Sequence, residues 1–243
     1  TLAKIDYGET ERFVRINALD TPHWQEDVRV CVAGGADGIR IPKCDTEQQI
    51  HDVEALVSKY EREYGVEVGS TLLMAAIESP LGVINAYSIA MASPRLMGIA
   101  LSGGDYRRCL QTKYYPSGNE LFGARSQIVI AARAAGIQCF DTVYTDFNDM
   151  EGFTREVHLI KEMGFDGKSI VTPKQIAVVH KIFAPTENEI FQAERVVRSV
   201  AENAEKGVGI FTLDGQMLDI AFVEGAQRVL DAARKMGLYK GEF

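Results

Sequence analysis

The chain has 243 residues, of which 46% are hydrophobic and 25% are charged, so it is able to bury the full core of a globular protein. Its formal net charge of −8 excludes nonspecific binding to nucleic acid or to an anionic membrane, because no basic cluster offsets that charge. There is no CxxC pair, no apolar run of about 18 residues and no signal peptide at the start, so we expect a cytoplasmic protein with reduced thiols.

Six apolar runs alternate along the chain with segments of helical period. The expected strands are Phe13–Ala18, Gly38–Ile41, Leu72–Ile77, Leu96–Leu101, Gln138–Tyr144 and Lys168–Val171. The expected helices are 46–65, Val83–Met91, Leu121–Ala135, Met150–Met163 and Lys174–Phe183. Since every strand is followed by a helical segment, the pattern predicts parallel strands joined by helical crossovers in an α/β fold.

The last part of the chain has a different pattern. A strongly amphipathic helix, "ENEIFQAERVVRSVAENAEKG", is followed by a turn at Asp214-Gly215 and by another helix. We therefore expect a barrel-like domain at 1–185 and a helical extension at 186–243, packed on the barrel or on a neighbouring subunit.

Polar residues recur where the predicted strands end, and the main ones are Arg15, Arg40, Glu78, Asp105 and Asp141. In a TIM-type (β/α)₈ barrel the carboxyl ends of the strands converge on one rim, and that rim carries the chemistry. No GxGxxG sequence opens the first helix, which disfavours a dinucleotide-binding sheet. We expect such a barrel, of which six βα units are present; two strands lie upstream of Thr1, or the sheet is open.

The chain resembles the citrate lyase β-subunit family, within the wider HpcH/HpaI aldolase superfamily. The resemblance covers almost the whole sequence and depends on seven motifs in register: "FVRINALDTPHWQEDV", "GIRIPKCDT", "AAIESPLGVINAYSIA", "GIALSGGDY", "CFDTVYTD", "GFDGKSIVTPKQI" and "LDGQMLDIAFVEGA". Members of this family begin with two further strands, so the resemblance implies a barrel that is incomplete at the N-terminal end of this sequence.

The resemblance also implies a set of site residues. It places Mg²⁺ between Glu78 and Asp105, a pair that suits a cation that prefers oxygen ligands. It assigns Arg15 to the substrate carboxylate, and Asp219 of the "GQMLD" motif as an acid/base group reaching a neighbouring subunit's rim. We also expect Glu78 and Arg40 at the substrate, although relatives vary at the position of Arg40 and a structural ion pair is an equal alternative there. From the residues alone, each carboxylate could equally be a helix N-cap or a surface group, and each arginine a structural ion-pair partner.

The implied activity is the Mg²⁺-dependent cleavage of citryl-[acyl-carrier protein] to acetyl-[acyl-carrier protein] and oxaloacetate. The implied partners are an acyl-carrier subunit with a phosphopantetheine-type arm and a transferase α subunit, with a homo-oligomer expected as well. Two alternatives stay open: a lyase for malyl-CoA or citramalyl-CoA, and an inactive assembly subunit.

Overall fold

The computed structural model describes residues 2, 4–204, 211–213, 216–218 and 220–241. These residues form two compact units, Thr1–Val179 and His180–Phe243. The division at residue 185 that we expect from the sequence stays a prediction. No helix in the described part of the chain is long and apolar enough to cross a membrane.

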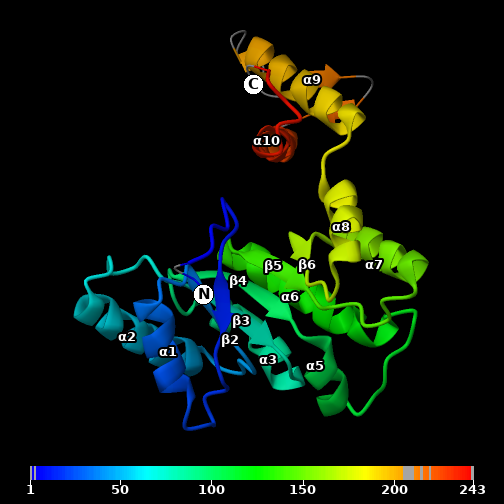
Figure 1. Ribbon diagram of the computed structural model, residues 1–243. Helices are drawn as coiled ribbons and strands as arrows, with labels where there is room; N and C mark the ends of the chain where they lie inside the picture. The colour runs from blue at the N-terminus through cyan, green and yellow to red at the C-terminus, as the bar shows by residue number, and fades with distance from the viewer. Residues whose placement is uncertain (1, 3, 205–210, 214–215, 219, 242–243) are drawn as a thin grey trace. The chain divides into compact units, whose positions relative to one another are not determined.

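The first unit is built on one parallel sheet, whose strands are neighbours in chain order (Figure 1). The strands are β1 (Phe13–Arg15), β2 (Gly38–Ile41), β3 (Leu72–Ile77), β4 (Leu96–Leu101), β5 (Gln138–Asp141) and β6 (Gly167–Lys168). Each pairing between neighbours is parallel, so all six carboxyl ends lie at the same edge. β3 and β4 are mostly buried, as expected for strands that are covered on both faces.

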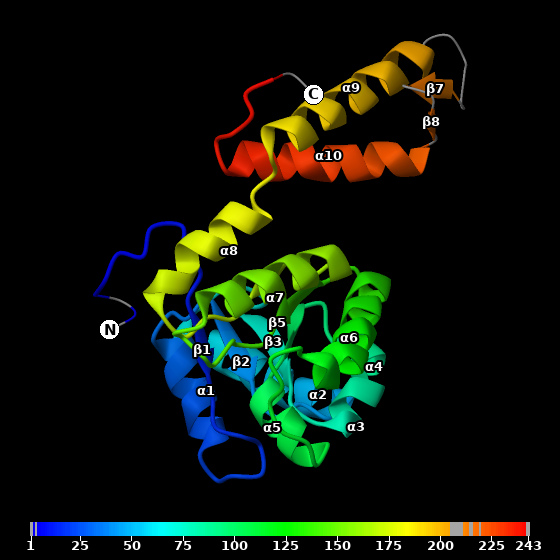
Figure 2. The same cartoon turned by 90° about the vertical axis from the view of Figure 1, so that its right-hand side faces the viewer.

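Helices connect the strands and form a layer beside the sheet (Figure 2). They are α1 (Trp24–Ala33), α2 (Glu47–Tyr64), α3 (Pro80–Ile84), α4 (Ala86–Met91), α5 (Gly103–Cys109), α6 (Phe122–Ala135) and α7 (Met150–Met163), with the short 3₁₀ turn η1 (Asn119–Leu121). The 3₁₀ turn η2 (Pro173–Gln175) and α8 (Ile176–Phe183) follow β6, the last strand of this sheet. In this layer α1 contacts α2, α2 contacts α4, α4 contacts α6 and α6 contacts α7. Helices that adjoin in this order curl around the sheet as in part of a barrel.

The predicted α/β class with six strand–helix units is confirmed. Within the described residues, β1 pairs only with β2 and β6 only with β5, so the sheet is a curled half-barrel and not a closed eight-stranded barrel. A capping box of Thr46 and Gln49 is present at the start of α2.

The single helix predicted over Val83–Met91 is wrong in its boundaries. The structure has two short helices, α3 and α4, which meet at Asn85. The side chain of Asn85 donates to the backbone carbonyl of Asp45 over 2.8 Å, which ties the junction to the loop after β2. Apolar periodicity continues across this junction, so the sequence pattern does not reveal the break.

The second unit contains α9 (Glu187–Ala204), the antiparallel pair β7 (Phe211–Leu213) and β8 (Gln216–Leu218), and α10 (Ile220–Lys235). The two helices pack through a small core of Ala193, Ala226 and Leu230. Two amphipathic helices were predicted here, and both are present. The predicted turn at Asp214-Gly215 lies outside the described residues.

Candidate functional site

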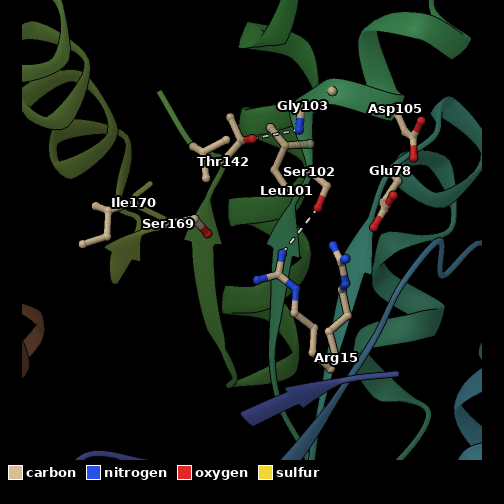
Figure 3. Close-up of a pocket in the computed structure, with 12 residues that line it drawn as sticks. Arg15, Glu78, Leu101, Ser102, Gly103, Asp105, Thr142, Ser169 and Ile170 are labelled. Carbon is tan, nitrogen blue, oxygen red and sulfur yellow. Dashed lines mark hydrogen bonds between the residues drawn. The ribbon is translucent and has the colours of Figure 1, made fainter. Parts of the chain in front are cut away.

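The carboxyl edge of the sheet holds a pocket of about 490 Å³ (Figure 3). Its lining residues come from the ends of all six strands of the sheet and the segments that follow them: Arg15, Arg40, Glu78, Leu101, Ser102, Gly103, Gly104, Asp105, Thr142, Val143, Ser169 and Ile170. Four of the five residues that the sequence assigns to the site are therefore in one pocket. The fifth, Asp219, lies outside the described residues.

Glu78 is positioned by the abrupt end of β3. The strand stops at Ile77, and Ser79 is the N-cap of α3, where its hydroxyl accepts from the Gly82 amide over 3.0 Å. Pro80 follows at the first helical position, where its fixed φ favours a helix start. Glu78 is held between two rigid elements, and its side chain is only 9% exposed.

Asp105 is held in the first turn of α5, where a carboxylate is favoured by the helix dipole. The turn begins at Gly103, whose amide donates to the hydroxyl of Thr142 over 2.8 Å. A Cβ atom at Gly103 would lie 3.0 Å from Arg107 Nη1 and 3.2 Å from Thr142, so a larger residue would fit here only if these side chains shifted. β5 therefore fixes the turn that carries Asp105.

The two carboxyl groups of the pocket, Glu78 and Asp105, lie side by side (Figure 3). Burial raises the pKa of Glu78, and the neighbouring Asp105 raises it further, against a backbone hydrogen bond from Lys43 and the charge of Arg40. A hydrogen bond from Arg108 lowers the pKa of Asp105, and so does sharing a proton with Glu78. Arg108 Nη2 is 3.0 Å from Asp105, but the Arg108 side chain is 67% exposed. Within the carboxyl pair, it is therefore the buried Glu78 whose pKa is raised, while the pKa of Asp105 is lowered.

Two guanidinium groups share the pocket with these carboxyl groups. Arg15 ends β1 and points into the cavity (Figure 3), and Arg40 lies in β2 at the register position directly beside it. Arg40 Nη2 donates to Ser102 Oγ over 3.4 Å, which is long for a strong hydrogen bond. The pocket therefore has an anionic side and a cationic side.

The donor set fits a magnesium ion. Mg²⁺ is usually bound by one or two protein carboxylates, with water and substrate oxygens completing its octahedron. The Glu78–Asp105 pair supplies that number of carboxylates, and a divalent cation would relieve their mutual repulsion. The described residues contain no group of three or more His, Cys, Asp or Glu side chains placed to hold a metal ion, so water and substrate oxygens would have to complete the octahedron.

Three hydroxyl groups of the pocket were missed by the sequence reasoning: Ser102, Thr142 and Ser169. Serine and threonine are common in turns, so their types alone give no signal of a site. Each of them, however, comes within two residues of a strand end that the sequence does mark. The rule that barrel rims carry function would have found them.

Asp141, also at a predicted strand end, has a structural role instead. It is fully buried at the end of β5 and is paired with both Arg125 and Lys168. The Lys168 ammonium group also donates to Glu156 over 2.6 Å and to the Thr142 carbonyl over 2.7 Å. This buried ion cluster, made of Arg125, Asp141, Glu156 and Lys168, lies directly behind Thr142.

Thr142→Val should weaken metal binding by about 10-fold, because it removes the acceptor that fixes the Asp105 turn and leaves a buried amide unpaired. Thr142→Ser keeps the hydroxyl and should bind metal nearly as well as the unchanged chain. Titration with Mn²⁺, following the free ion by electron paramagnetic resonance, measures both affinities. Equal weakening in the two variants would show that packing of the Thr142 methyl group, and not the hydrogen bond, is what matters.

Comparison with known proteins identifies the family of the chain. The family model described as HpcH/HpaI aldolase/citrate lyase matches residues 1–173, and a second, described as a C–C bond lyase of the TIM-barrel fold, matches residues 120–238. The chain is 49% identical over 241 residues to the citrate lyase subunit beta of Leuconostoc mesenteroides subsp. cremoris, covering 99% of this chain and 80% of that protein.

More distant relatives differ in their named activity. A (3S)-malyl-CoA thioesterase of Cereibacter sphaeroides is 31% identical, over 99% of this chain and 80% of that protein. Among solved structures, protein CitE from Mycobacterium tuberculosis, in complex with magnesium, acetoacetate and coenzyme A, superposes with a TM-score of 0.72 at 26% identity. That match covers 91% of this chain and 78% of the other.

Proposed function

Because the chain belongs to the HpcH/HpaI aldolase/citrate lyase family, we infer that it is a carbon–carbon lyase that cleaves citryl-[acyl-carrier protein] to acetyl-[acyl-carrier protein] and oxaloacetate. The observation that carries this inference is the 49% identity to a citrate lyase β subunit over nearly the whole chain. The pocket supports it, since it combines a carboxylate pair suited to a metal with arginines suited to an anionic substrate.

The reaction is a retro-Claisen cleavage. The tertiary hydroxyl of the citryl group loses its proton, its oxygen becomes the ketone of oxaloacetate, and the neighbouring C–C bond breaks. The electron pair of that bond passes to the acetyl thioester as an enolate, which then takes up a proton at carbon. An enzyme for this reaction must hold the substrate carboxylate, acidify the hydroxyl and supply the final proton.

The residues of the pocket divide these tasks. Glu78 and Asp105 would hold Mg²⁺, as the magnesium-bound structural relative suggests. When bound, the cation would acidify the substrate hydroxyl and orient the adjacent carboxylate. Arg15 binds that carboxylate with two parallel hydrogen bonds, and its place at the end of β1 suits a substrate that enters from the rim. The burial of Glu78 keeps its carboxylate from being fully hydrated.

Asp219 protonates the enolate in this proposal, reaching the rim of a neighbouring subunit of a homo-oligomer. Asp219→Asn should lower kcat by about 100-fold with little change in the stability of the fold, because general acid catalysis commonly contributes that much. Steady-state rates and a thermal unfolding curve, measured on the same preparation, test this together. A variant that unfolds more easily but keeps its full rate would make Asp219 a helix cap of α10 and not an acid.

We further propose that the (β/α)₈ barrel is completed outside these residues and that the chain acts with an acyl-carrier subunit and a transferase subunit. The carrier subunit would present its acyl group on a phosphopantetheine-type arm. The helical extension, placed by the sequence at 186–243, would lie against the barrel or a neighbouring subunit. Two findings support this set: the TIM-barrel family model and the naming of the relatives as subunits of a citrate lyase.

A substrate panel tests the activity directly. The purified protein would be given citryl and malyl thioesters, each on carrier protein and on CoA, with Mg²⁺ or with a chelator. We expect oxaloacetate from citryl-[acyl-carrier protein], and none once the metal is removed. Faster cleavage of malyl-CoA would favour the CoA-lyase alternative; malyl-CoA is also the substrate in the name of the 31% identical relative, a thioesterase. If none of the substrates is cleaved, the interpretation that remains is an inactive assembly subunit.

A further inference from the structure

Two positive charges lie next to each other in the candidate site. β1 and β2 are parallel, and their register pairs Arg15 with Arg40 directly. Side chains at paired positions of neighbouring strands project from the same face, about 4.8 Å apart at the backbone. Both guanidinium groups line the same pocket.

No carboxylate forms an ion pair with Arg40 in the part of the chain that the structure describes. Its recorded hydrogen bond is the 3.4 Å contact with Ser102, a neutral partner. Burial lowers the pKa of Arg40, and the positive charge of Arg15 lowers it further. The negative charge of Glu78 raises this pKa but does not outweigh the effect of burial. By contrast, Arg95, Arg107 and Arg125 of the same unit each pair with a carboxylate within 2.9 Å.

A part-buried guanidinium without an anion is unfavourable, because it has lost water and gained no ion pair in return. Arg40 is such a group, and with the more exposed Arg15 beside it, it makes a site for two anionic groups held close together. The candidate substrate has this property, since a citryl thioester keeps two free carboxylates: one on the carbinol carbon and one on the adjoining methylene. A citramalyl thioester has a methyl group in place of that carboxymethyl group and keeps only one.

We propose that Arg40 binds the second free carboxylate of the citryl group and that this contact makes the chain prefer citryl over citramalyl thioesters. The inference rests on the proposed function and deepens it. Arg15 takes the carboxylate that both substrates share, and Arg40 takes the one that only the citryl group has. Arg40 is thus a specificity-determining residue of the reaction.

The test compares two substrates that differ only in this group. In Arg40→Met, kcat/KM for the citryl thioester should fall by about 100-fold, the usual loss when one partner of a buried charge pair is removed. For the citramalyl thioester, kcat/KM should fall by less than about 3-fold. Arg40→Lys, which keeps the charge, should recover part of the citryl activity. Arg15→Met should lower kcat/KM for both substrates. Arg29→Met, on the exposed side of α1, should change kcat/KM for neither.

A binding measurement separates this proposal from the activity itself. Calorimetry would compare oxaloacetate, which has two carboxylates, with pyruvate, which has one, in the unchanged chain and in Arg40→Met. The variant should lose affinity for oxaloacetate and keep its affinity for pyruvate. Arg40→Gln serves as a second variant if methionine disturbs the fold.

Equal losses for both substrates and both keto acids would overturn the proposal and make Arg40 a structural residue, as would no loss at all. If the unchanged chain cleaves no citryl thioester, the proposed function fails, while the oxaloacetate and pyruvate titrations still decide the role of Arg40.

Discussion

Replacing Glu78 with glutamine should abolish the Mg²⁺-dependent cleavage of a citryl thioester while leaving the fold intact. An amide is a much weaker ligand than a carboxylate for a hard cation, and only one other carboxylate, Asp105, lines the pocket in the described residues. A catalytic metal supplies several kcal/mol of stabilisation, so we expect kcat/KM to fall by about 1,000-fold or more. Oxaloacetate release, coupled to malate dehydrogenase, measures the rate.

The matched control for this variant is Glu63→Gln, which makes the same chemical change on the exposed side of α2. It should keep the full rate. Removing the buried charge of Glu78 should not lower stability, because its raised pKa shows that the charged form is disfavoured at its site. A Glu78→Gln enzyme that stays within about 10-fold of the unchanged rate, with the same Mg²⁺ requirement, would remove Glu78 from the metal site.

The second large effect concerns stability. Asp141→Asn should lower the free energy of unfolding of the first unit by about 3–5 kcal/mol, because it leaves Arg125 and Lys168 as buried cations with only Glu156 to share. Urea unfolding followed by the fluorescence of Trp24, the only tryptophan, reports on this unit. Asp20→Asn, a change at an exposed position, should alter stability by less than about 0.5 kcal/mol.

This prediction carries a pH dependence of known sign. Burial alone would raise the pKa of Asp141, but the charges of Lys168 and Arg125 outweigh it and hold the pKa below its ordinary value. A carboxyl group with a lowered folded-state pKa contributes stability above its unfolded pKa and loses it as the pH falls through the folded one. The gap between the unchanged chain and Asp141→Asn should therefore be widest near neutral pH and should shrink in acid. A gap that is independent of pH would mean that the variant acts through packing.

The strand and helix pattern could be predicted from the sequence because it depends on local signals. Strands such as Leu72–Ile77 are apolar on both faces and end at polar residues, and Met150–Met163 has the same bounds in the prediction and in the structure. Strands were predicted too long where the apolar run continues into the following loop, as at Gln138–Tyr144, where β5 ends at Asp141. In that loop Tyr144 stays buried and donates to Asp149, so its apolar character reflects burial and not strand pairing.

For the site, the sequence predicted which residues line the pocket, but not which partners surround each of them. The position of Glu78 and Asp105 at strand ends brought them to one pocket, as did that of Arg15 and Arg40. The sequence could not distinguish Asp141, which also ends a strand, from a rim carboxylate. Its partners Arg125 of α6 and Lys168 of β6 come from other elements of the fold, and only the folded structure shows that they neutralise it.

The most direct test of the account is the position of the metal. A crystal structure of the protein with Mn²⁺ in place of Mg²⁺ and with oxaloacetate would locate the ion by its anomalous scattering. We predict one site between the carboxyl groups of Glu78 and Asp105, with ligand distances of about 2.1 Å, and the two oxaloacetate carboxylates on Arg15 and Arg40. An ion bound elsewhere, or Glu78 paired with an arginine while oxaloacetate occupies the pocket, would contradict the account.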